Sequence, residues 1–419
     1  MIRTIASRPR SPGWLTPLLL SMLVACSSSR TLGGEAGDAC PEEHLCGGAC
    51  VDVEADPHNC GGCGLACPGG EACRSGACCT PFNDDVDLLL MVDNSNTMAE
   101  QQALLVEQLP RLVGALASGD VDDDGTRDFP PVRSLHVGVV SSDMGTGGFT
   151  VPTCFEPSFG DDGVLRTQGN THIPGCMASY PRFLEFWPGD DVAAFTSQVT
   201  CAALMGVRGC GFEQPLEAVL KALTPSTAPI AFNMGTSGHA DGINNGFVRD
   251  DSVLAVLVLT DENDCSAADP EIFNPDTSVY RGDLNLRCFQ YPEAVHPIER
   301  YVDGLLALRT DPDRLIFAAI SGVPPDLVDD PSRTDFDAIL ADDRMREMVD
   351  PTMPTRLTPS CNVPGRGLSL PPRRIVQVAQ QLEARGATAV VQSICQPDFT
   401  PPIEAILERL SSKLGTRCR

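Results

Sequence analysis

A largely apolar run at residues 86–92 ends abruptly in the polar segment 93–97. A run of this length without regular polar alternation is typical of a strand buried on both faces of a parallel sheet. The expected strands are residues 86–92, 135–141, 253–260, 315–321 and 387–394, and the expected helices are residues 99–116, 214–223, 297–308, 373–385 and 402–414. This alternation predicts an α/β fold with a doubly wound, mostly parallel sheet and helices on both faces.

The polar segment after the first run carries oxygen ligands at every second residue, namely Asp93, Ser95 and Thr97. Carboxylate and hydroxyl oxygens are hard donors, so this spacing suits Mg²⁺, Mn²⁺ or Ca²⁺ better than Zn²⁺ or Cu²⁺. The pattern D-x-S-x-T after an apolar strand resembles the metal-ion-dependent adhesion site of von Willebrand factor type A domains. That resemblance implies Mg²⁺ and a second aspartate after a neighbouring strand. Asp261 fits this position because it follows the apolar run 254–259.

The third expected ligand departs from the pattern of that family. A threonine usually follows a glycine-containing loop and precedes a helix, and Glu213 occupies that place here. Glu213 either ligates the metal directly, which leaves less unsatisfied charge for a partner, or caps the following helix. Because Ser, Thr and Asp are also the favoured N-caps of helices, the alternative for the whole set is a group of helix caps without a metal.

A second cation site is expected in the acidic segment 120–128, which reads D-x-D-x-D-G-x-x-D. Carboxylates at loop positions 1, 3, 5 and 9, with glycine at position 6, match the first part of an EF-hand calcium loop. The predicted Ca²⁺ ligands are Asp120, Asp122, Asp124 and Asp128. The glutamate expected at position 12 is replaced by Pro131. The alternative is a solvated acidic turn.

The N-terminus predicts export and lipidation. Arginines at its start precede a short apolar stretch that ends in Leu23-Val24-Ala25-Cys26, which resembles a bacterial lipobox. Residues 1–25 would then be a signal peptide, Cys26 would be diacylated, and residues 26–39 would be a flexible tether to the outer membrane. The alternative is an ordinary secretory signal. A net charge of −26 argues against a nucleic-acid partner.

Nineteen cysteines indicate an oxidising compartment, and nine of them lie in residues 40–79. This segment is too short and too poor in large apolar residues to fold without disulfide bonds. The segment contains a sequence that resembles the repeat of the stigma-specific protein family, namely CGGACVDVEADPHNCGGCGLACPGGEACRSGAC. Zinc binding by Cys60-x-x-Cys63 with His58 is the alternative. Residues 80–419 are then the type A-like domain.

Cysteines also lie in the long insertions between the expected strands, where disulfide bonds would stabilise loops of this length. Proximity in the sequence suggests the pairs Cys154–Cys176, Cys201–Cys210, Cys265–Cys288 and Cys361–Cys395. Cys418 is then left over, as is one cysteine of the small module. We therefore expect a bond from Cys418 to Cys79 or Cys78 that joins the two modules.

Together these features predict a lipid-anchored envelope protein that binds a protein or glycan through a divalent metal ion, and not an enzyme. The sequence has no H-E-x-x-H, G-x-S-x-G or P-loop motif. One alternative is a structural scaffold of the envelope whose metal site is degenerate or purely stabilising. A further alternative is a metallohydrolase that uses Asp261, Glu262 and Asp264 around the metal.

Overall fold

The computed structural model describes residues 45–68, 71–81, 84–122, 124–364, 367–414 and 416–418. The predicted signal peptide (residues 1–25), the lipidation site Cys26 and the tether (residues 26–39) lie outside the described residues. None of the helices in the described ranges has the length and apolar character needed to cross a bilayer.

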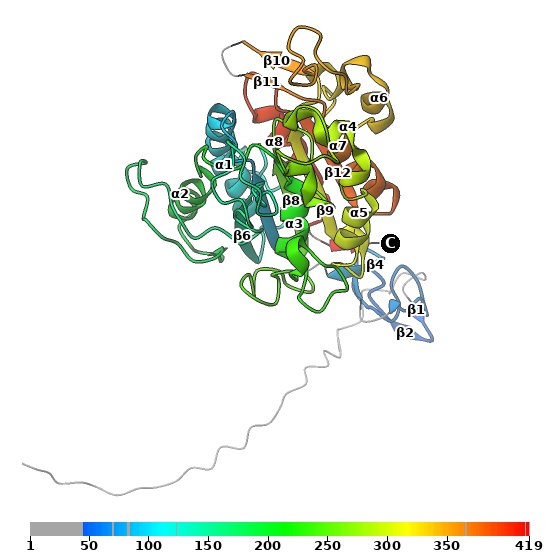
Figure 1. The fold of residues 1–419 in the computed structure, drawn as a ribbon. Coiled ribbons are helices and arrows are strands. Elements are labelled where there is room, and N and C mark those ends of the chain that lie inside the picture. The colour runs from blue at the N-terminus through cyan, green and yellow to red at the C-terminus, as the bar shows by residue number, and fades with distance from the viewer. Residues whose placement is uncertain are drawn as a thin grey trace, which may run out of the picture.

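A six-stranded sheet forms the centre of the large domain (Figure 1). Its strands are β5 (Asp85–Val92), β6 (Ser134–Ser141), β7 (Leu184–Phe186), β8 (Val253–Leu259), β9 (Leu315–Ser321) and β12 (Thr388–Ser393). The order across the sheet is β7-β6-β5-β8-β9-β12, and every adjacent pair is parallel except β6 with β7. All residues of β5, β6, β8 and β9 are buried, which explains why these strands lack polar alternation.

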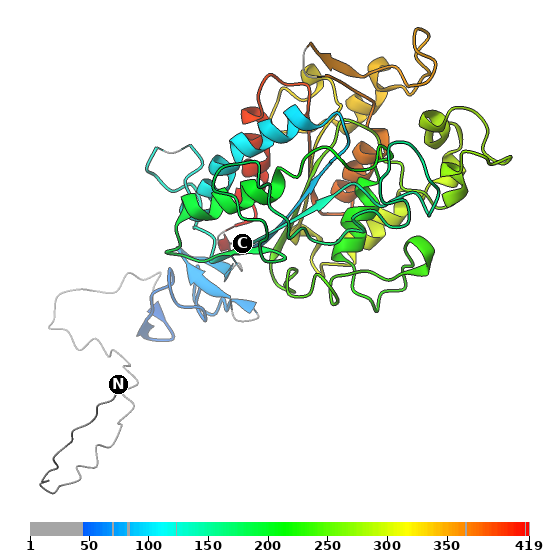
Figure 2. The same ribbon diagram turned by 60° about the vertical axis from the view of Figure 1, so that its left-hand side comes forward.

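Helices cover both faces of this sheet (Figure 2). The helices on one face are α1 (Ala99–Ser118), α2 (Val192–Ala203) and α8 (Thr400–Ser411), and those on the other are α3 (Pro215–Leu223), α5 (Glu299–Leu306), α6 (Phe336–Ala341) and α7 (Arg373–Ala384). The first core includes Leu109 and Ile406, and the second includes Val219 and Val378. The predicted α/β class, with a mostly parallel sheet between two helical layers, is therefore confirmed.

Each of the predicted strands and helices is present, with its ends displaced by three residues or fewer. Three elements of the central domain were not predicted, the antiparallel edge strand β7 and the helices α2 and α6. Within the insertions lie the short helix α4 (Arg287–Gln290) and a hairpin of β10 (Cys361–Val363) and β11 (Gly367–Ser369). The sequence pattern thus predicted the buried elements more accurately than the peripheral ones.

The cysteine-rich segment forms two small sheets, drawn in blue at one end of the large domain in Figure 1. One is a hairpin of β1 (Leu45–Cys46) and β2 (Ala49–Cys50). The other contains β3 (Ala72–Arg74), β4 (Ala77–Pro81) and the C-terminal strand β13 (Thr416–Cys418). Because β13 pairs with β4, the end of the chain is joined to the small module.

Disulfide bonds connect both modules internally. They include Cys46–Cys63, Cys60–Cys73, Cys67–Cys78, Cys154–Cys210, Cys176–Cys201, Cys265–Cys288 and Cys361–Cys395. The last two were predicted correctly. Cys60 and Cys63 are both used in disulfides, which leaves no thiolate at this motif for the zinc alternative.

The predicted pairs Cys154–Cys176 and Cys201–Cys210 are wrong. Cys201 lies in α2 and its carbonyl accepts a hydrogen bond from the backbone N–H of Asn170, which brings the loop containing Cys176 beside this helix. The chain then leaves α2 and carries Cys210 to Cys154, in a separate small core of the insertions. Closeness along the chain therefore failed to predict closeness in space once an unpredicted helix intervened.

The predicted bond between the modules is partly resolved. Cys78 is bonded to Cys67, so the alternative that joined Cys78 to Cys418 is wrong. Cys79 is disulfide-bonded, and the register of β4 and β13 places Cys418 opposite Cys79. The Cys79–Cys418 bond stays a prediction.

Candidate functional site

The candidate site lies where the order of the sheet changes direction. From β5 the chain proceeds outward to β6 and β7, and then returns to β8 on the other side of β5 before continuing to β9 and β12. In open α/β sheets, ligands bind outside the carboxyl ends of strands at such a switch point. Asp93 follows β5 and Asp261 lies two residues after β8, so the fold brings both predicted aspartates to this edge.

The D-x-S-x-T segment is held by hydrogen bonds to the first aspartate. Oδ1 of Asp93 accepts from the backbone N–H of Ser95 at 2.8 Å and from the Ser142 hydroxyl at 3.2 Å. Oδ2 accepts from the Thr260 hydroxyl at 2.7 Å. The hydroxyl oxygens of Ser95 and Thr97 lie 3.3 Å apart. The segment therefore presents two neighbouring hydroxyls beside a fixed and fully buried carboxylate.

Ser142 and Thr260 were not among the predicted site residues. Each is the first residue after a strand that borders β5, which is the signal that marks this edge of the sheet. Both orient Asp93 by donating a hydrogen bond to one of its oxygens.

The helix-cap alternative is wrong for Thr97 and Glu213. The N-cap residues are Met98 for α1 and Gln214 for α3, and neither caps its helix through its side chain. Asp264 instead caps the first turn of α3, because its Oδ1 accepts a hydrogen bond from the backbone N–H of Leu216 at 3.0 Å. The side chains of Thr97 and Glu213 are thus free of a capping role.

Carboxyl groups gather at this edge without a basic partner. Asp93, Glu213 and Asp261 are buried and Glu262 is partly buried. Within the described ranges, none of these four groups forms an ion pair with Lys, Arg or His. Oδ1 of Asp261 is buried and accepts no hydrogen bond from any described residue. The site therefore carries uncompensated negative charge and at least one unused ligand atom.

The same crowding shifts the proton equilibria of the site. Burial raises the pKa of Glu262 to about 7, and the nearby Asp93 carboxylate adds to the shift. Burial also raises the pKa of Glu213 well above its usual value, and Glu262, Asp93 and Asp261 add to it. Burial and the Asp93 charge likewise raise the pKa of Asp261. Glu213 and Glu262 lie close enough for each to influence the pKa of the other.

A cavity of about 440 Å³ opens beside this group of acids. Ser95, Thr97, Glu213 and Glu262 contribute to its lining. Apolar side chains such as Phe212, Phe289 and Leu357 and basic ones, Arg356, Arg373 and Arg374, contribute to the remaining walls. The cavity is large enough for a side chain or small group of a partner to approach the acids.

The acidic loop between α1 and β6 brings its carboxylates together. Oxygens of Asp120, Asp122 and Asp124 all lie within 4.8 Å of one another, whereas no three carboxylates of the β5–β8 edge converge so closely among the described residues. Asp128 instead accepts a hydrogen bond from the backbone N–H of Val121 at 2.9 Å. Three of the four predicted Ca²⁺ ligands are therefore grouped, and calcium binding stays a prediction.

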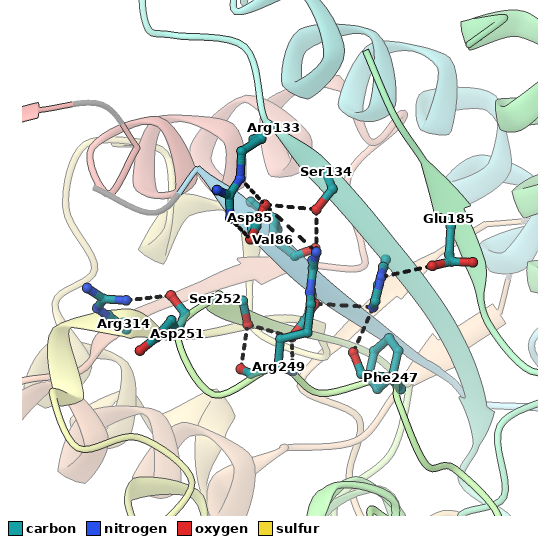
Figure 3. Close-up of polar contacts among 12 residues, drawn as sticks. Asp85, Val86, Arg133, Ser134, Glu185, Phe247, Arg249, Asp251, Ser252 and Arg314 are labelled. Atoms are coloured by element: carbon teal, nitrogen blue, oxygen red, sulfur yellow. Dashed lines mark hydrogen bonds and ion pairs between the residues drawn. The ribbon is translucent and has the colours of Figure 1, made fainter. Parts of the chain in front are cut away.

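A second group of buried carboxylates, at the amino end of β5, is fully paired (Figure 3). Asp87 accepts hydrogen bonds from Nε of Arg249 at 2.8 Å and from the Ser252 hydroxyl at 2.5 Å. Asp85 accepts from Nε of Arg133 at 3.0 Å and from the Ser134 hydroxyl. These acids are structural, because arginines and hydroxyls satisfy their charge and lone pairs.

No protein-family model matches this chain, and no match to a curated protein is found.

Proposed function

We propose that residues 80–419 form a von Willebrand factor type A-like domain that binds a protein or glycan through a divalent cation at the ends of β5 and β8. The observation that carries this proposal is the group of buried carboxylates without a basic partner. Buried charge is costly unless it is paired or coordinates a metal. The ends of β5 and β8 are also where an open α/β sheet accommodates a ligand.

The proposed ligands come from separate segments of the chain. Ser95 and Thr97 would supply hydroxyl oxygens, and Asp93, Asp261 and Glu213 would supply carboxylate oxygens. The unused Oδ1 of Asp261 and the absence of capping by Thr97 and Glu213 support this assignment. Hard oxygen donors favour Mg²⁺, Mn²⁺ or Ca²⁺. A bound cation would offset the mutual repulsion that now raises the pKa values of these acids.

The role in binding rests on the cavity beside the acids. It gives a partner access to the proposed metal, and its apolar walls would contribute contact area. The protein would act at the bacterial cell surface or in the periplasm, anchored to the outer membrane through lipidated Cys26 and the 26–39 tether. The acidic chain would not bind nucleic acid.

A structural scaffold is the second candidate, and one observation favours it. Glu213 is a buried carboxylate where the family pattern has a threonine, so a cation here is more fully neutralised by the protein itself. Such a site would stabilise the fold without needing a partner. No comparable observation among the described residues favours the metallohydrolase.

Two measurements test the proposal and separate the candidates. Elemental analysis and titration calorimetry of the mature, oxidised protein should detect one tight Mg²⁺ or Mn²⁺ at the β5–β8 edge, lost in Asp93→Asn and retained in Asp276→Asn, an exposed acid elsewhere. Capture of envelope proteins and glycans should then require the metal and fail in Asp93→Asn. Metal binding with capture unaffected by chelator would select the scaffold. Absence of bound metal would overturn the metal-dependent binding proposal and leave only a scaffold whose metal site is degenerate.

A further inference from the structure

A smaller cavity of about 230 Å³ lies at the carboxyl end of β6. Ser141, Asp161, Arg166 and Arg182 contribute polar groups to its wall, and Met205 contributes an apolar one. Oδ2 of Asp161 accepts hydrogen bonds from the Ser141 hydroxyl at 2.5 Å and from Nδ2 of Asn94 at 3.2 Å. The only acid in this wall is therefore already engaged.

The two arginines of this cavity have no acidic partner within ion-pair distance. Neither Arg166 nor Arg182 forms an ion pair with any residue in the described ranges. This is unusual in a chain with 56 acidic residues against 30 basic ones. Burial lowers the pKa of Arg166, and the more distant Asp161 charge only opposes this shift. The cavity thus carries partly desolvated positive charge inside a strongly acidic protein.

Main-chain carbonyls hold both guanidinium groups in place. Nε of Arg166 donates to the carbonyl of Gln168 at 2.9 Å, and Nη1 of Arg182 donates to the carbonyl of Leu165 at 2.9 Å. The backbone N–H of Arg166 donates to the carbonyl of Val139 in β6 at 2.7 Å, which fixes the segment to the sheet. Each guanidinium keeps further N–H donors that no described residue accepts. Fixed planar donors of this kind match the oxygens of an anion.

We propose that this cavity binds an oxyanion, a carboxylate or a phosphate or sulfate ester, on a group no larger than a monosaccharide. The size limit follows from the volume, which is below that of typical small-molecule sites. The inference rests on Arg166 and Arg182 and does not depend on the proposed metal site. Asp161 contacts Asn94 of the D-x-S-x-T segment, so the two sites are neighbours.

The experiment titrates D-glucuronate, glucose 6-phosphate, inorganic phosphate and uncharged D-glucose into the oxidised mature protein, at low ionic strength and with chelator present. Calorimetry should show saturable binding of at least one anion and none of glucose. Preference for glucuronate would identify a carboxylate ligand, and preference for the phosphates would identify a phosphate ester. Because the chelator removes divalent metal ions, anion binding is measured independently of whether the proposed metal site exists.

Variants then locate the binding. Arg166→Gln should weaken the affinity about tenfold or more, as expected for loss of a charge-assisted hydrogen bond. Arg166→Lys keeps the charge but loses the planar donors, so its affinity should be intermediate. Arg346→Gln, at an exposed arginine elsewhere, should bind like the native protein. Thermal melts without anion establish that each variant is folded. Equal binding by Arg166→Gln, equal binding of glucose, or no saturable binding by any anion would overturn the proposal.

Discussion

The two ends of strand β5 hold buried carboxylates in opposite states. At the amino end, Asp85 is hydrogen-bonded to Arg133 and Ser134 (Figure 3), and Asp87 is likewise hydrogen-bonded to an arginine and a hydroxyl. At the carboxyl end, Asp93 accepts hydrogen bonds only from neutral groups, and its acidic neighbours Glu213 and Asp261 have no basic partner among the described residues. Only five residues, 88–92, separate Asp87 of the neutralised cluster from Asp93 of the uncompensated one.

This contrast distinguishes structural acids from acids that await a ligand. Burial alone does not distinguish the two kinds of acid, because both groups are removed from water. A positively charged partner does distinguish them, since an unpaired buried charge is tolerated only when something outside the chain offsets it. In the cavity lined by Arg166 and Arg182 the situation is the opposite, because there the positively charged groups lack an acidic partner among the described residues.

The largest expected effect is at the amino end. Asp87→Asn should lower the free energy of unfolding by roughly 3–5 kcal/mol, because buried Arg309 loses its carboxylate and partly buried Arg249 loses the nearer of its two. Urea unfolding followed by circular dichroism measures this. Asp93→Asn is the matched change at the other end of the strand. Without metal, Asp93→Asn should leave the free energy of unfolding unchanged or raise it, since it removes the repulsion between Asp93 and the neighbouring acids. Similar losses in both variants would contradict the distinction.

Metal should stabilise the protein through the carboxyl end. At a free Mg²⁺ or Mn²⁺ concentration 100 times the dissociation constant, the free energy of unfolding should rise by about 2.7 kcal/mol. Thermal melts with and without chelator measure this gain, which Asp93→Asn should abolish and Asp87→Asn should retain. A gain that survives in Asp93→Asn would assign the metal to another place.

Without metal, stability should depend on pH in a direction set by the raised pKa values. A carboxyl group whose pKa is raised by folding is protonated in the folded protein while it is already ionised in the unfolded chain. The folded state then binds more protons, so stability falls as pH rises from about 4.5, the ordinary value for Glu, to about 7, the value for Glu262. Because each pKa unit corresponds to about 1.4 kcal/mol, the loss from Glu262 should be about 3 kcal/mol.

Glu262→Gln provides the control for this pH dependence. Because it removes the titrating group, urea unfolding between pH 4.5 and 7 should give a flatter profile than for the native protein, both with chelator. Saturating metal should flatten the native profile as well. Identical native and variant profiles would count against a raised pKa at Glu262.

The smallest expected effects are in the acidic loop. Calcium should raise the melting temperature slightly if it binds Asp120, Asp122 and Asp124, and Asp122→Asn should remove this increase. Gly125 has φ 84°, so Gly125→Ala should cost about 1 kcal/mol even without calcium, although space for a Cβ exists. If calcium does not change the melting temperature, the segment 120–128 is a solvated acidic turn and not a calcium site.

The sequence predicted the central sheet because its strands are buried on both faces and leave a continuous apolar signal. It missed β7, which has only three residues, and α2, whose N-cap Asp191 lies within a long insertion. Asp93 and Asp261 were predicted to share an edge, and they do. The proximity of Glu213 to Glu262 could not be predicted, because it depends on how two insertions fold beside the sheet.

The disulfide errors have the same origin. Cys265–Cys288 and Cys361–Cys395 close loops whose ends meet, and proximity in sequence was sufficient for them. The pairs of Cys154 and Cys201 depend on the path of α2 across the sheet. The paired arginines and aspartates at the start of β5 were also invisible in the sequence, because Arg249 is more than 150 residues from Asp87.

The position of β5 has a mechanical consequence. The strand begins just after the cysteine-rich module and ends about 26 Å away at the proposed binding edge. With the proposed anchor on one side and the proposed partner on the other, tension would pass lengthwise through this strand. Parallel neighbours flank it on both sides, so rupture would require many hydrogen bonds to shear at once instead of unzipping singly. The chain is thus built to resist pulling along its own central axis.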